Sequence, residues 1–200
     1  MGALMLRAES ASVLKAASVV KSGGLVVYPT DTVYGLGCDP LNGSAVDRVF
    51  EAKGRESKPL PVLCSTAEAA LRIVDLAPAA LALAERHWPG ALTIVAALRV
   101  QVPRRLDQGT GTLGVRVPGS PGCRELVAAC GGVLTGTSAN ISGRPSCRTA
   151  DEAAAQLGGS VDVILDGGRL EGLESTVVRV TGNDVIVLRQ GPVRVEEATK

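Results

Sequence analysis

The chain has 200 residues, which suit one domain or at most two small ones, and its 46% apolar and 20% charged residues are typical of a globular protein. Its 21 basic and 20 acidic residues give a net charge of +1, which excludes a global electrostatic grip on nucleic acid but not a local basic patch. One Trp, two Tyr and one Phe are too few for the base-stacking platforms of single-strand binders.

The first elements in chain order are a helix and a buried strand. The spacing of apolar residues predicts a helix over residues 11–21, and the apolar run 25–28 predicts a strand. Residues 30–37 then bring three side-chain hydroxyls, one carboxylate and two glycines to the exit of that strand. Ligand sites of α/β proteins commonly lie at such exits, so we predict a functional loop here rather than a structural turn.

Helix caps mark the next two helices. Residues 44–52 have helical spacing, with Ser44 placed to cap the first turn and Gly54 placed to end the helix. Ser65 and Glu68 form a capping box that opens a further helix. The remaining predicted elements are helices over residues 79–88, 123–130 and 149–157, and strands over residues 60–63, 91–98, 113–118, 133–135, 161–165, 176–180 and 185–189.

The alternation of helices and strands, followed by a strand-rich end, predicts the fold class. We expect an α/β domain with a twisted mixed β-sheet flanked by helices. No internal repeat, linker or low-complexity tract interrupts the sequence, so we expect a single domain over residues 1–200 without an additional C-terminal domain. The polar and basic loops all adjoin strands, and we expect them to converge on a concave basic ligand-binding face.

Three cations, Lys53, Arg55 and Lys58, fall within six residues at the end of the second predicted helix. One interpretation is that they complement the negative end of the helix dipole. The other is an anion clamp, because a mobile ammonium and a rigid guanidinium fork suit the oxygens of a polyphosphate. The segment alone favours the first interpretation, and the polar loops elsewhere in the chain favour the second.

Two further features are compatible with an anionic ligand. Arg116 interrupts an otherwise apolar strand and must face solvent, a partner or a ligand, because burying it unpaired is costly. Solvation at a sheet edge and contact with a ligand remain equally open. Residues 136–146 are dense in hydroxyl, amide and glycine groups but contain neither GxxxxGK[ST] nor GxGxxG, so neither familiar nucleotide loop applies.

Five cysteines without a CxxC pair predict reduced, mostly buried thiols rather than a disulfide frame or a zinc site. The one histidine, His87, cannot support a His-dependent triad by itself, and we interpret it as structural. The sequence shows neither a signal peptide nor an apolar run long enough to span a bilayer. We therefore expect a cytoplasmic protein with no membrane partner.

Five motifs in order resemble those of one family. They are residues 29–37 (PTDTVYGLG), Lys53-x-Arg55, residues 115–118 (VRVP), residues 137–143 (TSANISG) and residues 174–176 (EST). Each motif alone is weak, but the ordered set, over about residues 10–193, resembles the YrdC/TsaC family of L-threonylcarbamoyladenylate synthases. The family often has a proline where this chain has Glu56. The resemblance implies a YrdC-like fold.

The resemblance implies that L-threonine, bicarbonate and ATP, with Mg²⁺, give threonylcarbamoyl-AMP and pyrophosphate for the threonylcarbamoyl-adenosine modification of tRNA. The threonine amine and bicarbonate form a carbamate, whose oxygen attacks the α-phosphate of ATP. No enzyme nucleophile is required, so catalysis is expected from positioning and charge neutralisation. The Mg²⁺ ligands stay unassigned, since triphosphate and water oxygens commonly supply most of them. A downstream threonylcarbamoyl-transferase complex is the implied recipient of the product.

The implied site residues follow position by position. Lys53 and Arg55 are the implied catalytic residues and form a phosphate clamp with Lys58. The residues that resemble threonine contacts, with Arg116 as partner of the substrate carboxylate and Tyr34 as a cover, are Thr32, Tyr34, Arg116, Gly136 and Ser175. The residues that resemble nucleotide contacts are Arg55, Lys58, Thr112, Ser138, Asn140, Ser146 and Arg189.

Two alternatives from other classes remain. An RNA-binding module of the same fold would use the basic cluster for a weak contact with tRNA, although the near-neutral charge and the scarce aromatics count against it. A carbamoyl-transfer domain of the hydrogenase-maturation type resembles this fold within a much larger protein and would use carbamoyl phosphate. Exchanging substrates in a pyrophosphate-release assay separates this second alternative from the synthase.

Overall fold

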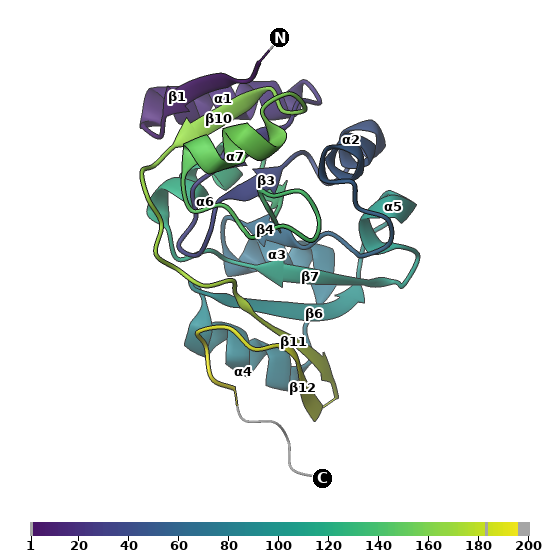
Figure 1. Ribbon diagram of the computed structural model, residues 1–200. Helices are drawn as coiled ribbons and strands as arrows, with labels where there is room; N and C mark the ends of the chain where they lie inside the picture. The colour runs from purple at the N-terminus through teal and green to yellow at the C-terminus, as the bar shows by residue number, and fades with distance from the viewer. Residues whose placement is uncertain (1, 183, 196–200) are drawn as a thin grey trace.

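The computed structural model describes residues 2–182 and 184–195 (Figure 1). Its helices are α1 (Ser10–Lys21), α2 (Gly43–Lys53), α3 (Ala67–Ile73), α4 (Pro78–His87), α5 (Arg104–Asp107), α6 (Pro121–Ala129) and α7 (Ala150–Leu157). Its strands are β1 (Leu4–Arg7), β2 (Val26–Tyr28), β3 (Gly35–Gly37), β4 (Val62–Cys64), β5 (Val74–Asp75), β6 (Leu92–Leu98), β7 (Thr112–Arg116), β8 (Val133–Thr135), β9 (Thr137–Ser138), β10 (Val163–Asp166), β11 (Thr176–Thr181) and β12 (Asp184–Arg189).

The strands form two mixed sheets. One sheet has the order β1-β10-β2-β3-β9, in which β1, β10 and β2 run parallel while β3 and β9 pair antiparallel. The other has the order β12-β11-β6-β7-β4-β8, with β5 paired to β6. Figure 1 shows the first sheet in the upper half of the molecule and the second in the lower half. The predicted α/β class is confirmed, and the single sheet expected from the sequence is divided in two.

The chain passes directly from one sheet to the other between β8 and β9. The backbone N–H of Gly136, the residue between these strands, donates to the carbonyl of Pro61 at 2.8 Å. A Cβ atom at Gly136 would lie 2.6 Å from Cγ of Leu63, so a side chain does not fit at this crossing. Thr135 ties the sheets further, because its hydroxyl accepts from the N–H of Cys38 at 2.8 Å.

Helices cover the sheets and enclose the core. One apolar cluster joins α1 and α6 to strands of both sheets, and a larger cluster fills the space beneath α2, α4 and α7. Four cysteines are fully buried and Cys130 is half-buried, which confirms the prediction of mostly buried free thiols. Burial raises the pKa of the Cys38 and Cys64 thiols to about 12.

The helix boundaries differ from the predicted ones in their caps. Asn42 rather than Ser44 caps α2, accepting from Ala45 N at 3.1 Å, because the helix begins earlier than the apolar spacing indicated. Thr66 rather than Ser65 caps α3, since the backbone of Ser65 is held by a bond from its N–H to Gly132 O. Gly54 ends α2 in the left-handed conformation with φ 55°, as predicted.

Strands β1, β3, β5 and β9 and helix α5, of two to four residues each, were not predicted from the sequence. The three-residue strands β2, β4 and β8 were predicted, because each overlaps one of the apolar runs named above. Within the described residues, no helix is long and apolar enough to cross a membrane.

Candidate functional site

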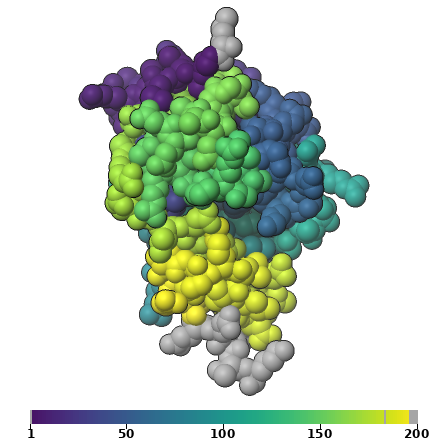
Figure 2. Space-filling view, viewed as in Figure 1, coloured from purple at the N-terminus to yellow at the C-terminus, as the bar shows by residue number. Residues whose placement is uncertain are grey.

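A cavity of about 540 Å³ opens where the two sheets meet, a size that falls in the usual range for small-molecule sites. In the space-filling view, the segment around residues 140–150 (green) faces the C-terminal strands (yellow), and these segments belong to opposite sides of the junction (Figure 2). Residues from both sheets and from the basic segment line the cavity. The predicted site residues among them are Thr32, Arg55, Lys58, Thr112, Arg116, Gly136, Ser138, Ser175 and Arg189.

Arg116 lies at the enclosed end of the cavity, which we define by Thr32, Arg116 and Ser175. Its guanidinium forms an ion pair with Asp31, with 2.6 Å between Nη2 and Oδ1, and the two side chains are 6% and 21% exposed. Nε donates to the carbonyl of Gly90 at 2.8 Å, and Nη1 donates to Thr32 Oγ1 at 3.2 Å. The buried arginine is therefore oriented on three sides before any ligand arrives, and solvation at a sheet edge is excluded as its role.

Ser175 completes the enclosed end and connects it to Arg189. Its hydroxyl shares a hydrogen bond with Thr93 Oγ1 at 2.9 Å and accepts from Nη2 of Arg189 at 3.2 Å. Nε of Arg189 donates to the Ser175 carbonyl at 3.0 Å. Arg189, a predicted nucleotide contact, is therefore hydrogen-bonded to Ser175, a predicted threonine contact.

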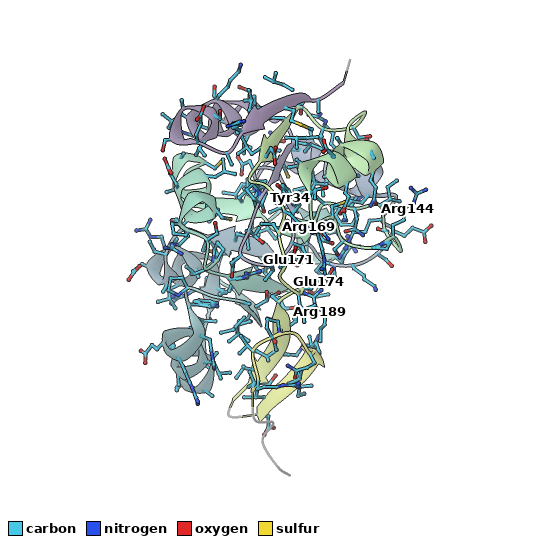
Figure 3. The ribbon with its side chains drawn as sticks, turned by 60° about the vertical axis from the view of Figure 1, so that its left-hand side comes forward. Tyr34, Arg144, Arg169, Glu171, Glu174 and Arg189 are labelled. Carbon is cyan, nitrogen blue, oxygen red and sulfur yellow. The ribbon has the colours of Figure 1, made fainter. Side chains whose placement is uncertain are left out.

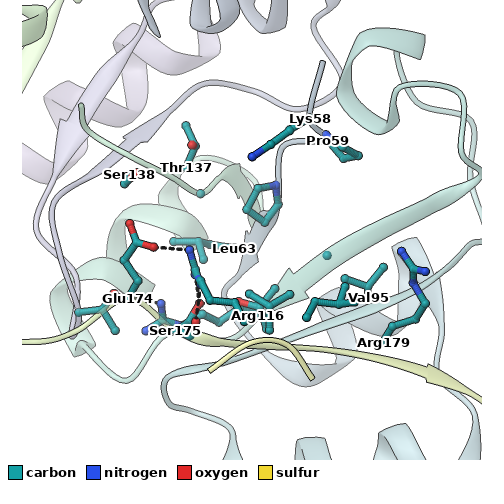
Figure 4. A pocket seen from close by; sticks show the side chains of 18 of the residues that line it. Lys58, Pro59, Leu63, Val95, Arg116, Thr137, Ser138, Glu174, Ser175 and Arg179 are labelled. Carbon is teal, nitrogen blue, oxygen red and sulfur yellow. Dashed lines mark hydrogen bonds and ion pairs between the residues drawn. The ribbon is translucent and has the colours of Figure 1, made fainter. Parts of the chain in front are cut away.

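Glu174 is the one carboxylate among the described lining residues. It forms an ion pair with Arg189; both are labelled in Figure 3, and Figure 4 shows Glu174 at the cavity. It also accepts a hydrogen bond from the hydroxyl of Ser146. Both partners are predicted nucleotide contacts, and Ser146 itself is not a lining residue. The carboxylate therefore already engages groups that the sequence assigned to an anionic ligand.

Arg55 and Lys58 lie at the open end of the cavity, which we define by Arg55, Lys58 and Arg179. The left-handed turn at Gly54 directs the chain out of α2, and Arg55 bonds its own loop, from Nε to Lys58 O and from Nη2 to Pro59 O, both at 2.9 Å. Partial burial lowers the pKa of Arg55. Within the described part of the chain, the Lys58 ammonium has no hydrogen-bond or ion-pair partner.

Lys53 lies behind the cavity wall. Its side chain is 1% exposed, and Nζ donates to the carbonyls of Ser138 and, at 2.7 Å, Asn140. Its own carbonyl accepts from Ser142 N at 2.8 Å. Burial, reinforced by the charge of Arg55, lowers the pKa of Lys53 to about 8. In this structure Lys53 holds the loop that carries Ser138, and its predicted phosphate contact remains a prediction.

Tyr34 and Asn140 also lie outside the lining. Tyr34 is fully buried, and its hydroxyl donates to Gly168 O at 2.6 Å, so it does not cover the cavity as expected. Nδ2 of Asn140 donates to the carbonyls of Ile141 and Arg144, while its buried Oδ1 has no partner among the described residues. Both side chains fix loops next to the cavity.

Much of the cavity floor is apolar and was not predicted from the sequence. The alternation of residues along a strand could have identified two floor residues. Val177 and Arg179 share a face of β11 and follow Ser175 at intervals of two residues. The lining residues that were not predicted as site residues include Val33, Pro59, Pro61, Leu63, Thr93, Val95, Thr110, Gly114, Thr137, Glu174, Val177, Arg179 and Leu188.

One family model and several known proteins are similar to most of this chain. The family model Sua5/YciO/YrdC, described as telomere recombination, matches residues 18–191. A threonylcarbamoyl-AMP synthase of Pyrococcus abyssi is 38% identical over 197 residues, which cover 97% of this chain and 58% of that protein. A putative threonylcarbamoyl-AMP synthase of Mycobacterium tuberculosis is 40% identical over 191 residues, covering 94% of this chain and 88% of the relative.

A solved structure resembles the fold over the same region. P. abyssi Sua5 complexed with L-threonine superposes with a TM-score of 0.88 at 38% identity. The match covers 94% of this chain and 56% of that chain. The chain therefore spans between half and two thirds of the length of the archaeal relative and most of the length of the mycobacterial one.

Proposed function

This chain belongs to the Sua5/YciO/YrdC family, and from that premise we propose that it is an L-threonylcarbamoyladenylate synthase, a nucleotidyltransferase. It would condense L-threonine, bicarbonate and ATP to threonylcarbamoyl-AMP and pyrophosphate. One observation carries the proposal. The cavity brings an arginine pre-oriented for a carboxylate, Arg116, together with the cations Arg55 and Lys58, although these residues lie far apart in the sequence.

The enclosed end has the chemistry for an amino acid. The guanidinium of Arg116 would bind the threonine carboxylate, with its ion pair to Asp31 holding the arginine in place. The hydroxyls of Thr32 and Ser175 would read the hydroxyl and amine of the substrate. A site that bonds a substrate hydroxyl rejects an analogue without it, because its buried polar groups are then left unpaired. Valine is therefore expected to be a poor substrate.

The reaction would proceed between the two ends. The amine of bound threonine and bicarbonate form a carbamate with loss of water. A carbamate oxygen then attacks the α-phosphorus of ATP, the bond to the β-phosphate oxygen breaks, and pyrophosphate leaves. Arg55 and Lys58 would neutralise the charge on the phosphates, and Ser138, held by Lys53, would donate to them. No side chain needs to form a covalent bond.

We propose that Mg²⁺ binds together with ATP. Over the described residues, no group of three or more His, Cys, Asp or Glu side chains is arranged to hold a metal ion. Triphosphate oxygens and water would supply most of its ligands. We place the reaction in the cytoplasm, where the product would pass to a threonylcarbamoyl-transferase complex that modifies tRNA.

The test follows pyrophosphate release from the purified chain with ATP, Mg²⁺, bicarbonate and L-threonine. Release should require threonine, and Arg55→Ala should abolish it, whereas Arg86→Ala, a change on the exposed side of α4, should not. Equal release without threonine would overturn the proposal. Release with carbamoyl phosphate in place of threonine and bicarbonate would favour the carbamoyl-transfer alternative. Salt-sensitive tRNA binding without pyrophosphate release would favour the RNA-binding alternative.

A further inference from the structure

The loop over residues 139–147 follows β9 and connects Ser138 to Ser146, two of the predicted nucleotide contacts. Lys53 holds the start of this loop through the carbonyl of Ser138. The chain then turns at Gly143, which has a φ of 84°, and returns past Ser146 toward α7. A loop that turns in this way needs a second support if Ser146 is to keep one position.

Gln156, in the last turn of α7, provides this second support. The backbone N–H of Ile141 donates to Gln156 Oε1 at 3.0 Å. Nε2 of Gln156 donates to the sulfur of Cys147 at 3.3 Å and, over a longer 3.4 Å, to the carbonyl of Pro145. These partners fix the orientation of the amide, because the N–H needs an acceptor and the carbonyl needs a donor. One side chain therefore ties the outgoing and returning parts of the loop together.

Helix α7 is itself held firmly by the first sheet. Its residues Ala150, Ala153 and Leu157 are buried, and the helix packs on β10, beside it in Figure 1, and on β2. Thr149 caps its first turn. Gln156 is half-buried between this helix and the loop. Side chains on packed helices are held more precisely than side chains on loops, so Gln156 can impose the order of the helix on the loop.

The loop reaches the cavity at both of its ends. Ser138 lines the cavity, and the hydroxyl of Ser146 donates to Glu174, which also lines it. Gln156 is not among the described lining residues. It can therefore affect a ligand in the cavity only through the loop that it holds.

We infer that Gln156 is a positioning residue for the nucleotide, which holds the loop so that Ser138 and Ser146 present their hydroxyls in one arrangement. The inference rests on the proposed function in taking ATP as the ligand of these serines. Without the amide, the loop would adopt several arrangements and ATP would have to select one of them, which lowers its affinity. The enclosed end of the cavity belongs to other segments of the chain, so the affinity for threonine should not follow.

The experiment measures ATP and L-threonine binding to the full chain separately by calorimetry, with Mg²⁺ present and bicarbonate absent. Gln156→Met keeps the length of the side chain but removes its hydrogen bonds. It should weaken ATP binding about five- to tenfold and leave L-threonine binding within about twofold. Gln101→Met is the matched control, the same change at an exposed glutamine outside the lining, and should alter neither affinity. Thermal unfolding establishes that each variant is folded.

Hydrogen exchange at the Ile141 amide provides a second readout that needs no ligand. Protection of this amide should fall in Gln156→Met, because its acceptor is gone. It should return in Gln156→Glu, since a carboxylate offers an acceptor oxygen at the same place. Amides of the β6–β7 ladder should keep their protection in both variants, whereas a general loss of packing would lower it there as well.

Four results would overturn the inference. They are absence of ATP binding to the unmodified chain, ATP affinity that is unchanged in folded Gln156→Met, equal losses of ATP and L-threonine affinity, and Ile141 protection that does not depend on Gln156. ATP binding that depends on Gln156, combined with no threonine-dependent pyrophosphate release, would reject the proposed function and leave the positioning role standing.

Discussion

The two ends of the cavity hold their cations in different ways. At the enclosed end, Arg116 is buried and bonded to Asp31, Thr32 and the Gly90 backbone. At the open end, Lys58 and Arg179 are exposed and have no acceptor within the described residues. A guanidinium fixed on three sides discriminates by geometry, because a ligand must match an orientation that is already set. Free cations attract charge with little demand on geometry.

The contrast fits the two ligands of the proposed reaction. A small zwitterion such as threonine offers little binding energy, so its site must be ordered in advance. ATP carries several charges and can recruit mobile side chains as it binds. The predictions below test whether the enclosed end works through fixed geometry and the open end through charge.

After the complete loss of pyrophosphate release expected of Arg55→Ala, the largest effect is expected at Arg116. Arg116→Ala should lower kcat/KM for threonine by roughly 10³-fold, because truncating one partner of a buried charge pair costs about 2–5 kcal/mol and strands the other. Arg116→Lys should recover little, since an ammonium cannot reproduce the three-sided fork. Steady-state pyrophosphate release at varied threonine measures both variants.

Arg48 provides the matched control for this prediction. It pairs with Asp162 at 2.9 Å, but both side chains are about two-fifths exposed, at 41% and 42%. Arg48→Ala should leave kcat/KM within about twofold, because exposed ion pairs contribute little. Thermal unfolding of each variant separates a lost contact from a lost fold. A folded Arg116→Lys enzyme with near-normal kcat/KM would break the comparison between the ends.

The second prediction concerns Lys53, the buried cation behind the open end. Its pKa of about 8 in the folded chain lies below the ordinary 10.5, so between these values the unfolded chain binds more protons. Stability from this group is therefore lowest below pH 8 and rises as the pH increases toward 10.5. The gain should be on the order of 2 kcal/mol relative to Lys53→Met. Denaturant unfolding of both proteins at several pH values measures it.

Comparing wild type with Lys53→Met removes the contribution of other groups that titrate in the same range, such as Cys38. A difference in unfolding free energy that stays flat from pH 8 to pH 10.5 would mean that Lys53 is not desolvated. It would then belong with the exposed cations of the open end.

The third prediction uses salt. Raising the salt concentration from about 50 mM to about 500 mM should raise KM for ATP by roughly three- to tenfold, because exposed charges are screened over distances of a few ångströms at such ionic strength. KM for threonine should change much less, since Arg116 is shielded from solvent. Equal salt dependence of the two KM values would show that the ends do not differ in the way described.

The smallest effect is expected at Glu174. Glu174→Gln should lower KM for ATP about two- to fivefold, because the carboxylate competes with the phosphates for Arg189 and the amide does not. Glu171→Gln is the control, since Glu171 pairs with Arg169 outside the cavity, and both are labelled in Figure 3. An increase in KM for ATP in Glu174→Gln would mean instead that Glu174 supports nucleotide binding.

Much of the fold could be predicted from the sequence because its longer elements carry a periodic apolar pattern. Helices α1, α2 and α4 and strands β6, β11 and β12 lie where the pattern placed them. The division into two sheets could not be predicted. It depends on β3 and β9, which have three and two residues and are defined by their partners rather than by their own sequence.

The sequence predicted which residues belong to the site better than it predicted where their side chains point. The motif residues at both ends do line one cavity, but Lys53 and Tyr34 prove to be buried supports next to it. Sequence spacing cannot tell whether a polar side chain points into a cavity or into the wall behind it. Arg179 could have been found by counting along the strand from Ser175, because alternate residues share one face of a sheet.

The crossing at Gly136 has a consequence for how the molecule can be divided. Arg116 precedes this glycine and Ser138 follows it, so a cut at Gly136 separates Ser138 from the strand that carries Arg116 and leaves β8 and β9 on different fragments. Neither fragment would contain all the residues that line the cavity. Recovery of activity on mixing two such fragments would thus report that they had associated. Gly136 is therefore a suitable position at which to divide the chain for a split-enzyme sensor.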